Sequence, residues 1–212
     1  MPCDQCVGIE QEFGRREVQR QQRDYRRKGA PPTTRLLIEA LLEAGVEDQT
    51  VLDIGGGVGA LQHALLKAGA SHAQSVEGSS AYLEVARQEA DRLGVADRIQ
   101  AVQGDFVQLA DSIGEADIVT LDRVICCYDN MGGLVAESAR RARRRYGLVY
   151  PRDLWWLRPA FAASNLLLRL RRRPFRVFLH PTAAVEAVIA GHGLKKSFHR
   201  NRGLWQVVLF SA

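Results

Sequence analysis

Apolar and polar positions follow two alternating periodicities from Thr50 onward. Short apolar runs typical of buried strands are separated by longer segments in which apolar residues recur at helical spacing. The expected strands are 50–54, 73–77, 98–105, 116–122 and 145–151, and the expected helices between them are 58–69, 79–94 and 131–144. Strands and helices in strict succession predict right-handed crossovers and therefore a parallel sheet.

The segments on either side of this region have other patterns. Residues 9–28 predict a polar helix with few apolar anchors, and residues 33–45 predict an amphipathic helix capped by threonine and ended by Gly45. Residues 153–173 predict an inserted amphipathic helix, and 181–193 a further helix. Two strands, 194–200 and 204–210, flank a short turn, so we expect the sheet to end in an antiparallel pair.

The composition is that of an ordinary globular chain, with 212 residues, 46% hydrophobic and 25% charged. The length suits one domain, which we divide into an arginine-rich N-terminal helix or flap, 1–31, and a main domain, 32–212, carrying residues 153–175 as a lid. No apolar run approaches the roughly 20 residues of a membrane-spanning helix, and the N-terminus has no signal-peptide pattern. We therefore expect a cytoplasmic protein.

Positive charge is concentrated in three stretches, Arg15–Gly29, Arg140–Arg145 and Arg169–Arg176, within a net charge of +5. Such stretches suit an anionic small molecule, nucleic acid or an anionic membrane, and solvated helix faces explain them equally well. Residues 155–173 combine an apolar face with a basic end, so peripheral membrane contact is an alternative to a lid.

The four cysteines carry no strong metal signature. Cys3 and Cys6 form a single C-x-x-C pair, whereas a zinc site needs two such pairs or a pair with histidines. Cys126 and Cys127 are adjacent, and a disulfide framework is not expected. We expect structural thiols and no metal, with a soft metalloid at Cys126 and Cys127 as the alternative.

A glycine-rich loop follows the first expected strand in "TVLDIGGGVGAL", residues 50–61. Gly55, Gly57 and Ala60 fit the G-x-G-x-x-G/A fingerprint of dinucleotide sites, where backbone N–H groups hold a pyrophosphate. Asp53 argues against that ligand, because a carboxylate 4 Å from a phosphate charge costs roughly 4 kcal/mol at an effective dielectric near 20. NAD binding is therefore the poorer interpretation.

Three acidic residues, Asp53, Glu77 and Asp105, stand at the expected carboxyl ends of consecutive strands. Ligands of open parallel sheets bind outside these ends. A ligand matched to three carboxylates offers an ammonium, a diol and an amino-bearing base, and lacks phosphate. S-adenosylmethionine has all of these and a sulfonium. Each acid alone could instead be a helix N-cap.

These motifs resemble those of the class I S-adenosylmethionine-dependent methyltransferases. "LDIGGGVG" (52–59) matches their D-x-G-x-G-x-G loop, and "SVEGSSAYLEVAR" (75–87) and "VQGDF" (102–106) are similar to their second and third motifs. The resemblance covers about Pro32 to the end, which makes 32–212 the expected methyltransferase domain. It implies a Rossmann-like, doubly wound, seven-stranded α/β fold, mostly parallel with an antiparallel last strand.

The resemblance also implies a cofactor site for S-adenosylmethionine. Asp53 would face the methionine part, Glu77 would bind the ribose diol, and Asp105 would accept from the adenine amine. The implied cofactor residues are Asp53, Gly55, Gly57, Gly59, Glu77, Gly78, Asp105, Phe106 and Asp122.

A narrower resemblance concerns the acceptor. "DIVTLDRVICCY" (117–128), "GLVYPRDLWW" (147–156) and "FRVFLHP" (175–181) are similar to bacterial small-molecule methyltransferases, some of them grouped with magnesium-protoporphyrin O-methyltransferases. We therefore expect in-line methyl transfer to a small molecule. The acceptor's identity, the atom methylated and the oligomeric state stay open.

Polar residues after the fourth expected strand are candidates for the acceptor side. Asp122, Tyr128 and His180 are the candidate catalytic residues, and an imidazole titrates near neutral pH. Arg123 could bind a substrate carboxylate bidentately, while Tyr128 and His180 could also contact the acceptor and Tyr25 could close over the cofactor. Structural roles are the alternative: Asp122 could pair with Arg123, and His180 could make a hydrogen bond beside a helix N-terminus.

Two other functions stay open. The arginine stretches prompt a nucleic-acid methyltransferase, although the chain has "DRVICCY" (122–128) where amino-methylating DNA enzymes carry an N/D-P-P-Y/F motif. A catalytically silent, cofactor-binding regulator of the same fold is the second, and the intact cofactor motifs argue against it.

Overall fold

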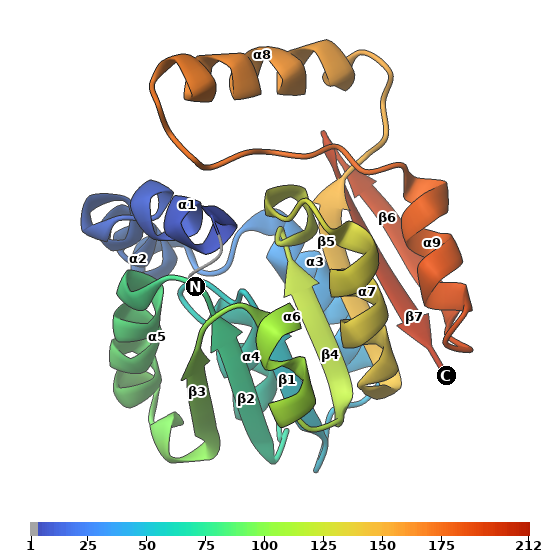
Figure 1. Ribbon diagram of the computed structural model, residues 1–212. Helices are drawn as coiled ribbons and strands as arrows, with labels where there is room; N and C mark the ends of the chain where they lie inside the picture. Colours follow the sequence, from blue (N-terminus) through green and yellow to red (C-terminus); the bar gives the residue numbers. More distant parts are fainter. Residues whose placement is uncertain (1–3) are drawn as a thin grey trace.

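The computed structural model describes residues 4–212, with side chains for residues 8–212. Seven strands form one sheet in the order β3-β2-β1-β4-β5-β7-β6 (Figure 1). Strands β1 to β5 pair in parallel, and β7 runs antiparallel to both β5 and β6. The strands are β1 Thr50–Ile54, β2 His72–Glu77, β3 Ile99–Gln103, β4 Ala116–Asp122, β5 Ala142–Pro151, β6 Lys195–Arg202 and β7 Trp205–Ser211. The predicted seven-stranded α/β fold with an antiparallel last strand is confirmed.

Helices cover both faces of the sheet. Side chains alternate between the faces of a strand, so Leu52 belongs to one apolar core and its neighbour Val51 to the other. The first core is covered by α6 Phe106–Leu109, α7 Met131–Arg140 and α9 Thr182–Ala190, and the second by α3 Pro32–Glu43, α4 Ala60–Lys67 and α5 Ser80–Leu93. This two-sided burial explains why the strands read as continuous apolar runs.

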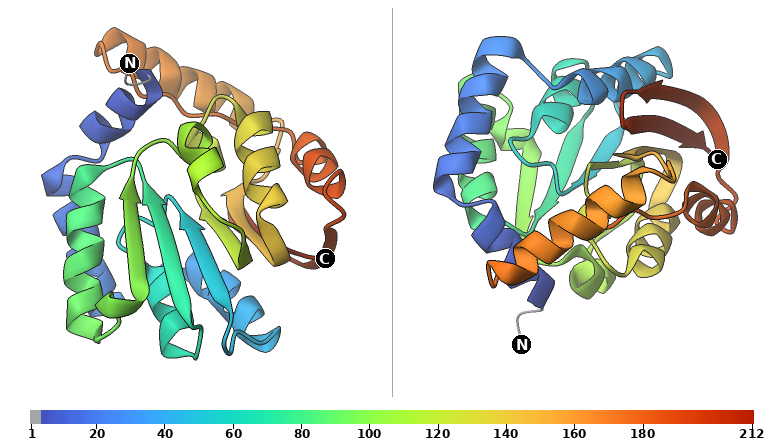
Figure 2. Two further views of the ribbon diagram at one scale, coloured as in Figure 1. Left: turned by 60° about the horizontal axis from the view of Figure 1, so that its bottom comes forward. Right: turned by 90° about the horizontal axis from the view of Figure 1, so that it is seen from above.

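Three further helices lie toward the carboxyl ends of the parallel strands. They are α1 Asp4–Glu12, α2 Arg15–Lys28 and α8 Leu157–Leu170. α2 runs beside α5, whereas α8 stands above the sheet on two extended connections and passes close to α1 (Figures 1 and 2). Within residues 4–212, no helix has the length and apolar character needed to cross a membrane.

The single helix predicted for residues 9–28 is wrong, because α1 and α2 are separate. Gly14 breaks the helical conformation with an extended backbone, φ −70° and ψ 167°. The ring of Phe13, beside this break, lies 5.5 Å from Tyr82 and 5.7 Å from Phe175 between centroids. Val18 of α2 is buried against α5. The polar composition continues through the break and therefore concealed it.

The threonine cap predicted for the next helix is also wrong. α3 begins at Pro32, whose missing N–H suits the first helical position. Thr33 and Thr34 lie buried inside the first turn. The Thr34 hydroxyl donates to the carboxylate of Asp122, so this threonine contacts the end of β4 instead of capping its own helix.

The helices predicted over 131–144 and 153–173 are shorter in the structure. α7 ends at Arg140, and the arginine stretch continues as the start of β5. β5 pairs with β4 on one side and β7 on the other, and this pairing overrides the helical pattern of the arginines. α8 occupies only the middle of its predicted range.

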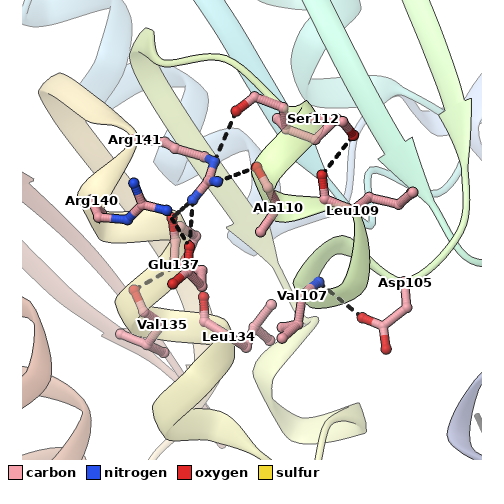
Figure 3. A network of polar contacts seen from close by, with 12 residues as sticks. Asp105, Val107, Leu109, Ala110, Ser112, Leu134, Val135, Glu137, Arg140 and Arg141 are labelled. Carbon is pink, nitrogen blue, oxygen red and sulfur yellow. Dashed lines mark hydrogen bonds and ion pairs between the residues drawn. The ribbon is translucent and has the colours of Figure 1, made fainter.

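One arginine of this stretch, Arg141, is buried beside the amino ends of β4 and β5. The guanidinium of Arg141 donates to the Ile113 carbonyl at 3.0 Å and to the Glu137 carboxylate at 2.7 Å (Figure 3). It also lies 5.5 Å from the centre of the Phe106 ring. Arg141 therefore supports α6, whose first residue follows Asp105.

Candidate active site

A cavity of about 830 Å³ opens at the carboxyl ends of the strands. Its walls come from the glycine loop after β1, the ends of β2 and β4, the loop after β3, helices α1 and α2, and the segment after α8. The predicted site residues that line it are Tyr25, Asp53, Gly55, Gly57, Glu77, Gly78, Asp105, Phe106, Asp122, Arg123 and Tyr128. Gly59 and His180 lie outside this lining.

Strand register brings the predicted acids to one edge of the sheet. Asp53 of β1 pairs in register with Ser75 of β2 and Thr120 of β4, and Glu77 is the last residue of β2. Asp105 follows β3 by two residues. Parallel strands end at a common edge, and the acids therefore gather although they are far apart in the chain.

Asp53 is fully buried and only partly hydrogen-bonded. Its Oδ1 accepts from the Thr120 hydroxyl at 2.8 Å, while Oδ2 has no hydrogen-bond partner within residues 8–212. Burial, together with the nearby charges of Asp122 and Glu77, raises the pKa of this carboxyl to about 7, and the hydrogen bond from Thr120 opposes the rise. Gly56 packs so closely on the carboxylate that a Cβ would have no room. An unsatisfied buried carboxylate oxygen fits a site for a cation.

Glu77 organises the glycine loop. Its two oxygens accept from the backbone N–H groups of Gly57 at 3.1 Å and Ser79 at 2.9 Å. Burial raises the pKa of Glu77, and the backbone hydrogen bonds oppose that rise. Gly57 has φ +58°, a conformation that favours glycine and turns its N–H toward the carboxylate.

Asp105 links two loops at the far side of the cavity. It caps α6 by accepting from Val107 N–H at 3.0 Å, so the N-cap role left open from the sequence is present (Figure 3). The Tyr128 hydroxyl lies 2.9 Å from each oxygen of the same carboxylate. This contact joins the loops after β3 and β4, and no local pattern in the sequence indicated it.

Asp122 and Arg123 pair with each other while both line the cavity. Arg123 Nε lies 3.2 Å from Asp122 Oδ1, and the Thr34 hydroxyl donates to Oδ2 of the same carboxylate. Arg123 has φ +61°, which is unusual for a residue with a side chain. Its N–H donates to the Val149 carbonyl at 2.8 Å, which anchors this backbone.

His180 contacts the loop after β4 and not the cavity. Its Nε2 lies 3.1 Å from the carbonyl oxygen of Ile125 and 2.9 Å from that of Tyr128. Both neighbours are acceptors, so Nε2 carries a hydrogen. The ring stacks on Phe178 at 5.8 Å. His180 thus holds the turn that carries Tyr128.

The adjacent cysteines belong to the cavity wall. Cys126 is buried, and its Sγ lies 3.8 Å from that of Cys127. No group of three or more potential metal-ligating side chains occurs in the part of the chain that the structure describes. The C-x-x-C of Cys3 and Cys6, at which no metal is expected, lies outside the described side chains, because these begin at residue 8.

Several lining residues were not singled out from the sequence. Examples are Glu12, Phe13, Arg35, Tyr82, Phe175 and Trp205. Tyr82 and Phe175 lie within the motifs 75–87 and 175–181 but were given no role there, and the others sit on elements that only the tertiary fold brings over the strand ends.

Comparisons with known proteins agree with this geometry. Residues 51–145 match the family model described as a methyltransferase domain. The ribosomal protein L11 methyltransferase of Dechloromonas aromatica is 36% identical over 114 residues, covering 52% of this chain and 38% of that protein. The match to its Exiguobacterium counterpart covers 28% of that protein. The chain thus matches well under half the length of these relatives.

Two solved structures share the fold over nearly the whole chain. Magnesium protoporphyrin IX methyltransferase from Synechocystis has a TM-score of 0.73 at 18% identity and covers 96% of this chain and 97% of its own. An O-methyltransferase family protein from Burkholderia thailandensis has a TM-score of 0.74 at 17% identity. The match covers 96% of this chain and 63% of that protein's chain.

The sheet order, the glycine loop and the acids at the carboxyl ends of β1, β2, β3 and β4 are typical of an S-adenosylmethionine-binding α/β domain. The fold is that of the class I S-adenosylmethionine-dependent methyltransferases, and residues 51–145, just under half of the chain, match the family model of a methyltransferase domain. The unpartnered oxygen of Asp53 fits this cationic cofactor.

Proposed function

We propose that this chain methylates a small, largely apolar acceptor that carries an acidic group. The observation that carries the proposal is the cavity of about 830 Å³, which is lined by the cofactor motifs at one side and by α1 and α2 at the other. Ligand pockets of drug-sized molecules span roughly 300–1,000 Å³. The volume therefore suits a cofactor together with a small acceptor.

On the cofactor side, three acids are available to accept hydrogen bonds or positive charge from different parts of the cofactor. We assign the buried Asp53 to the positive charge of the methionine part, Glu77 to the ribose hydroxyls and Asp105 to the adenine amine. Gly57 and Gly78 keep the backbone close. When bound, the cofactor supplies an electrophilic methyl group on its sulfonium.

On the acceptor side, Arg123 and Arg35 supply positive charge at the cavity wall. Arg123 is already oriented by its pairing with Asp122, and a guanidinium holds a carboxylate with two parallel hydrogen bonds. Phe175 and Val177 add apolar wall from the segment after α8. The acceptor's acidic group and its apolar part are thus contacted by different elements of the fold.

Positioning is the main catalytic contribution of this site. In-line transfer needs aligned reactants, and a base is needed only if the acceptor's proton has a high pKa. Asp122 is the carboxylate that faces the acceptor side and is the candidate base for such a proton. Tyr128 is engaged with Asp105, and we assign His180 a positioning role through its two carbonyl contacts.

Radiolabelled cofactor incubated with cell extract tests this function. We expect label in the small-molecule fraction, with little in the protein and nucleic-acid fractions. Label confined to macromolecules would contradict the acceptor class, as would cofactor binding without any turnover, which is the behaviour of a silent regulator.

The variant Arg123→Gln distinguishes an effect on acceptor binding from an effect on cofactor binding. We expect it to raise KM for an acidic acceptor by about tenfold, since a charge-assisted contact is lost, while the cofactor's dissociation constant stays within about twofold of the original. Arg87→Gln, an exposed arginine on α5 outside the cavity, is the matched control and should change neither. An unchanged KM in Arg123→Gln would refute the assignment.

A further inference from the structure

Helix α8 is attached to the molecule along one side only. Leu157 is buried at its start. Near its middle, Asn165 donates to the Val177 carbonyl at 2.7 Å and accepts from the Val177 N–H at 2.9 Å. Phe161 and Leu168, which share this side at helical spacing, are half-buried. The remaining circumference faces outward above the body of the protein (Figures 1 and 2).

The outward side of α8 is apolar, which is unusual for a helix at a protein surface. We define the α8 surface as Trp155, Trp156, Leu166, Leu167 and Leu170. Trp155 is 79% exposed, Leu170 73% and Leu166 59%. A helix that packs only against its own protein places polar residues on its outer face. Large exposed apolar groups gathered in one place indicate an interaction site.

Positive charge borders this surface, and of its six arginines only Arg158 and Arg173 pair with an acid in the described part of the chain, Asp153 and Glu12 respectively. Residues 154–185 contain no Asp or Glu, and their arginines are Arg158, Arg169, Arg171, Arg172, Arg173 and Arg176. Within residues 8–212, Arg169, Arg171 and Arg172 form no ion pair. On the arginine-rich helix α2, three of the six arginines, Arg20, Arg26 and Arg27, pair with an acid.

We propose that the α8 surface docks on an anionic lipid membrane. Tryptophan and arginine suit the interface, where an apolar side enters the acyl boundary and guanidinium groups meet lipid phosphates. α8 has 14 residues, about 21 Å of helix, so it lies in the interfacial plane and does not span the bilayer. Docking there places the cavity wall at Phe175 and Val177 beside the membrane. This inference goes beyond the proposed methylation and does not require it.

A second copy of the chain is the less favourable occupant. A symmetric contact through α8 would bring the unbalanced arginines of two copies together, and like charges across an interface oppose association. An anionic lipid surface offers partners for both parts of this surface: the acyl boundary for the apolar side chains and the phosphates for the arginines. Charge complementarity therefore favours lipid.

Vesicle binding by the full chain tests the proposal. We expect sedimentation with vesicles of phosphatidylglycerol and phosphatidylcholine, weaker binding to phosphatidylcholine alone, loss at high salt and a blue shift of tryptophan fluorescence. The double variant Leu166→Ser, Leu170→Ser should lower the partition coefficient at least about tenfold. Arg169→Gln with Arg171→Gln and Arg172→Gln should lower it about fivefold per arginine, on anionic vesicles only.

Matched controls come from surfaces elsewhere in the fold. Leu42→Ser on α3 removes another exposed leucine, and Arg143→Gln with Arg144→Gln removes two exposed arginines at the start of β5. Both should bind like the unaltered chain, and circular dichroism checks that all variants fold. Absence of vesicle binding, or equal losses in the controls, would overturn the proposal. The surface would instead belong to a contact between copies of the chain under two conditions. The unaltered chain would not bind vesicles, and it would form a dimer in sedimentation velocity that the double variant Leu166→Ser, Leu170→Ser does not form.

Discussion

Asp53 is the residue whose environment is most informative about the ligand. It is fully buried, accepts one hydrogen bond from Thr120, and burial raises its pKa to about 7. A cation placed near its second oxygen would favour the ionised form. Cofactor binding and ionisation of Asp53 are therefore linked.

The first prediction at this scale concerns Asp53→Asn and pH. In the unaltered protein, cofactor affinity should rise from pH 6 to pH 7.5, because the carboxyl titrates near pH 7 and only its ionised form attracts the cation. The slope is at most about tenfold per pH unit. Asp53→Asn should bind about tenfold more weakly at pH 7.5 and lose this pH dependence, as measured by calorimetry.

Asp91→Asn, an exposed acid on α5, serves as the control and should keep both the affinity and the slope. A pH-independent affinity in the unaltered protein would show that Asp53 does not ionise on binding.

At the scale of elements, α2 is held on α5 by one buried carboxylate. Glu89 accepts from Gln22 Nε2 at 2.7 Å, Arg26 Nε at 2.7 Å and Arg92 Nε at 2.8 Å. Because α2 also supplies cavity wall through Tyr25, this contact connects the N-terminal segment to the cofactor site.

Glu89→Gln should loosen α2. The variant leaves two arginines without their buried partner, and we expect a loss of about 2 kcal/mol in the free energy of unfolding, since the arginines themselves are half exposed. Urea denaturation measures the loss, and faster tryptic cleavage at the α2 arginines locates it. Glu17→Gln, which breaks a surface pair with Arg20, should cost no more than about 0.5 kcal/mol. Equal losses in both variants would refute the special role of Glu89.

At the scale of the whole molecule, His63 makes stability depend on pH. This residue of α4 is fully buried beneath the glycine loop, and neither ring nitrogen has a partner within residues 8–212. Burial lowers its pKa to about 4, below its ordinary 6.5. The unfolded chain therefore takes up the proton first, and stability decreases as pH falls from 6.5 toward 4.

The expected loss is about 3 kcal/mol at pH 4, with a slope of up to about 1.4 kcal/mol per pH unit. Asp53 acts in the opposite direction over the same range, because its folded pKa is raised. Urea denaturation of the unaltered chain and of His63→Leu, compared at pH 7 and pH 5, cancels the Asp53 contribution. Relative to the unaltered chain, His63→Leu should have a higher free energy of unfolding at pH 5 than at pH 7. The same difference in the free energy of unfolding at both pH values would contradict the prediction.

The sequence by itself determined the alternating strands and helices, the antiparallel end of the sheet and the acids at the strand ends. These features are local: periodicity reports which faces are buried, and the loop "DIGGGVG" (53–59) encodes its own turn. The helix predicted over 79–94 is likewise confirmed as α5, which begins after its cap Ser79 and ends at Gly94.

Only the tertiary structure decided which distant residues meet. The pairing of Tyr128 with Asp105 depends on the order of β3 and β4 in the sheet, and the arginines after Arg140 became a strand because β5 is paired on both sides. The outward apolar side of α8 has the same hydrophobic pattern as a buried helix. Periodicity records which side chains share a face, whereas the neighbours that cover that face come from elements far away in the chain.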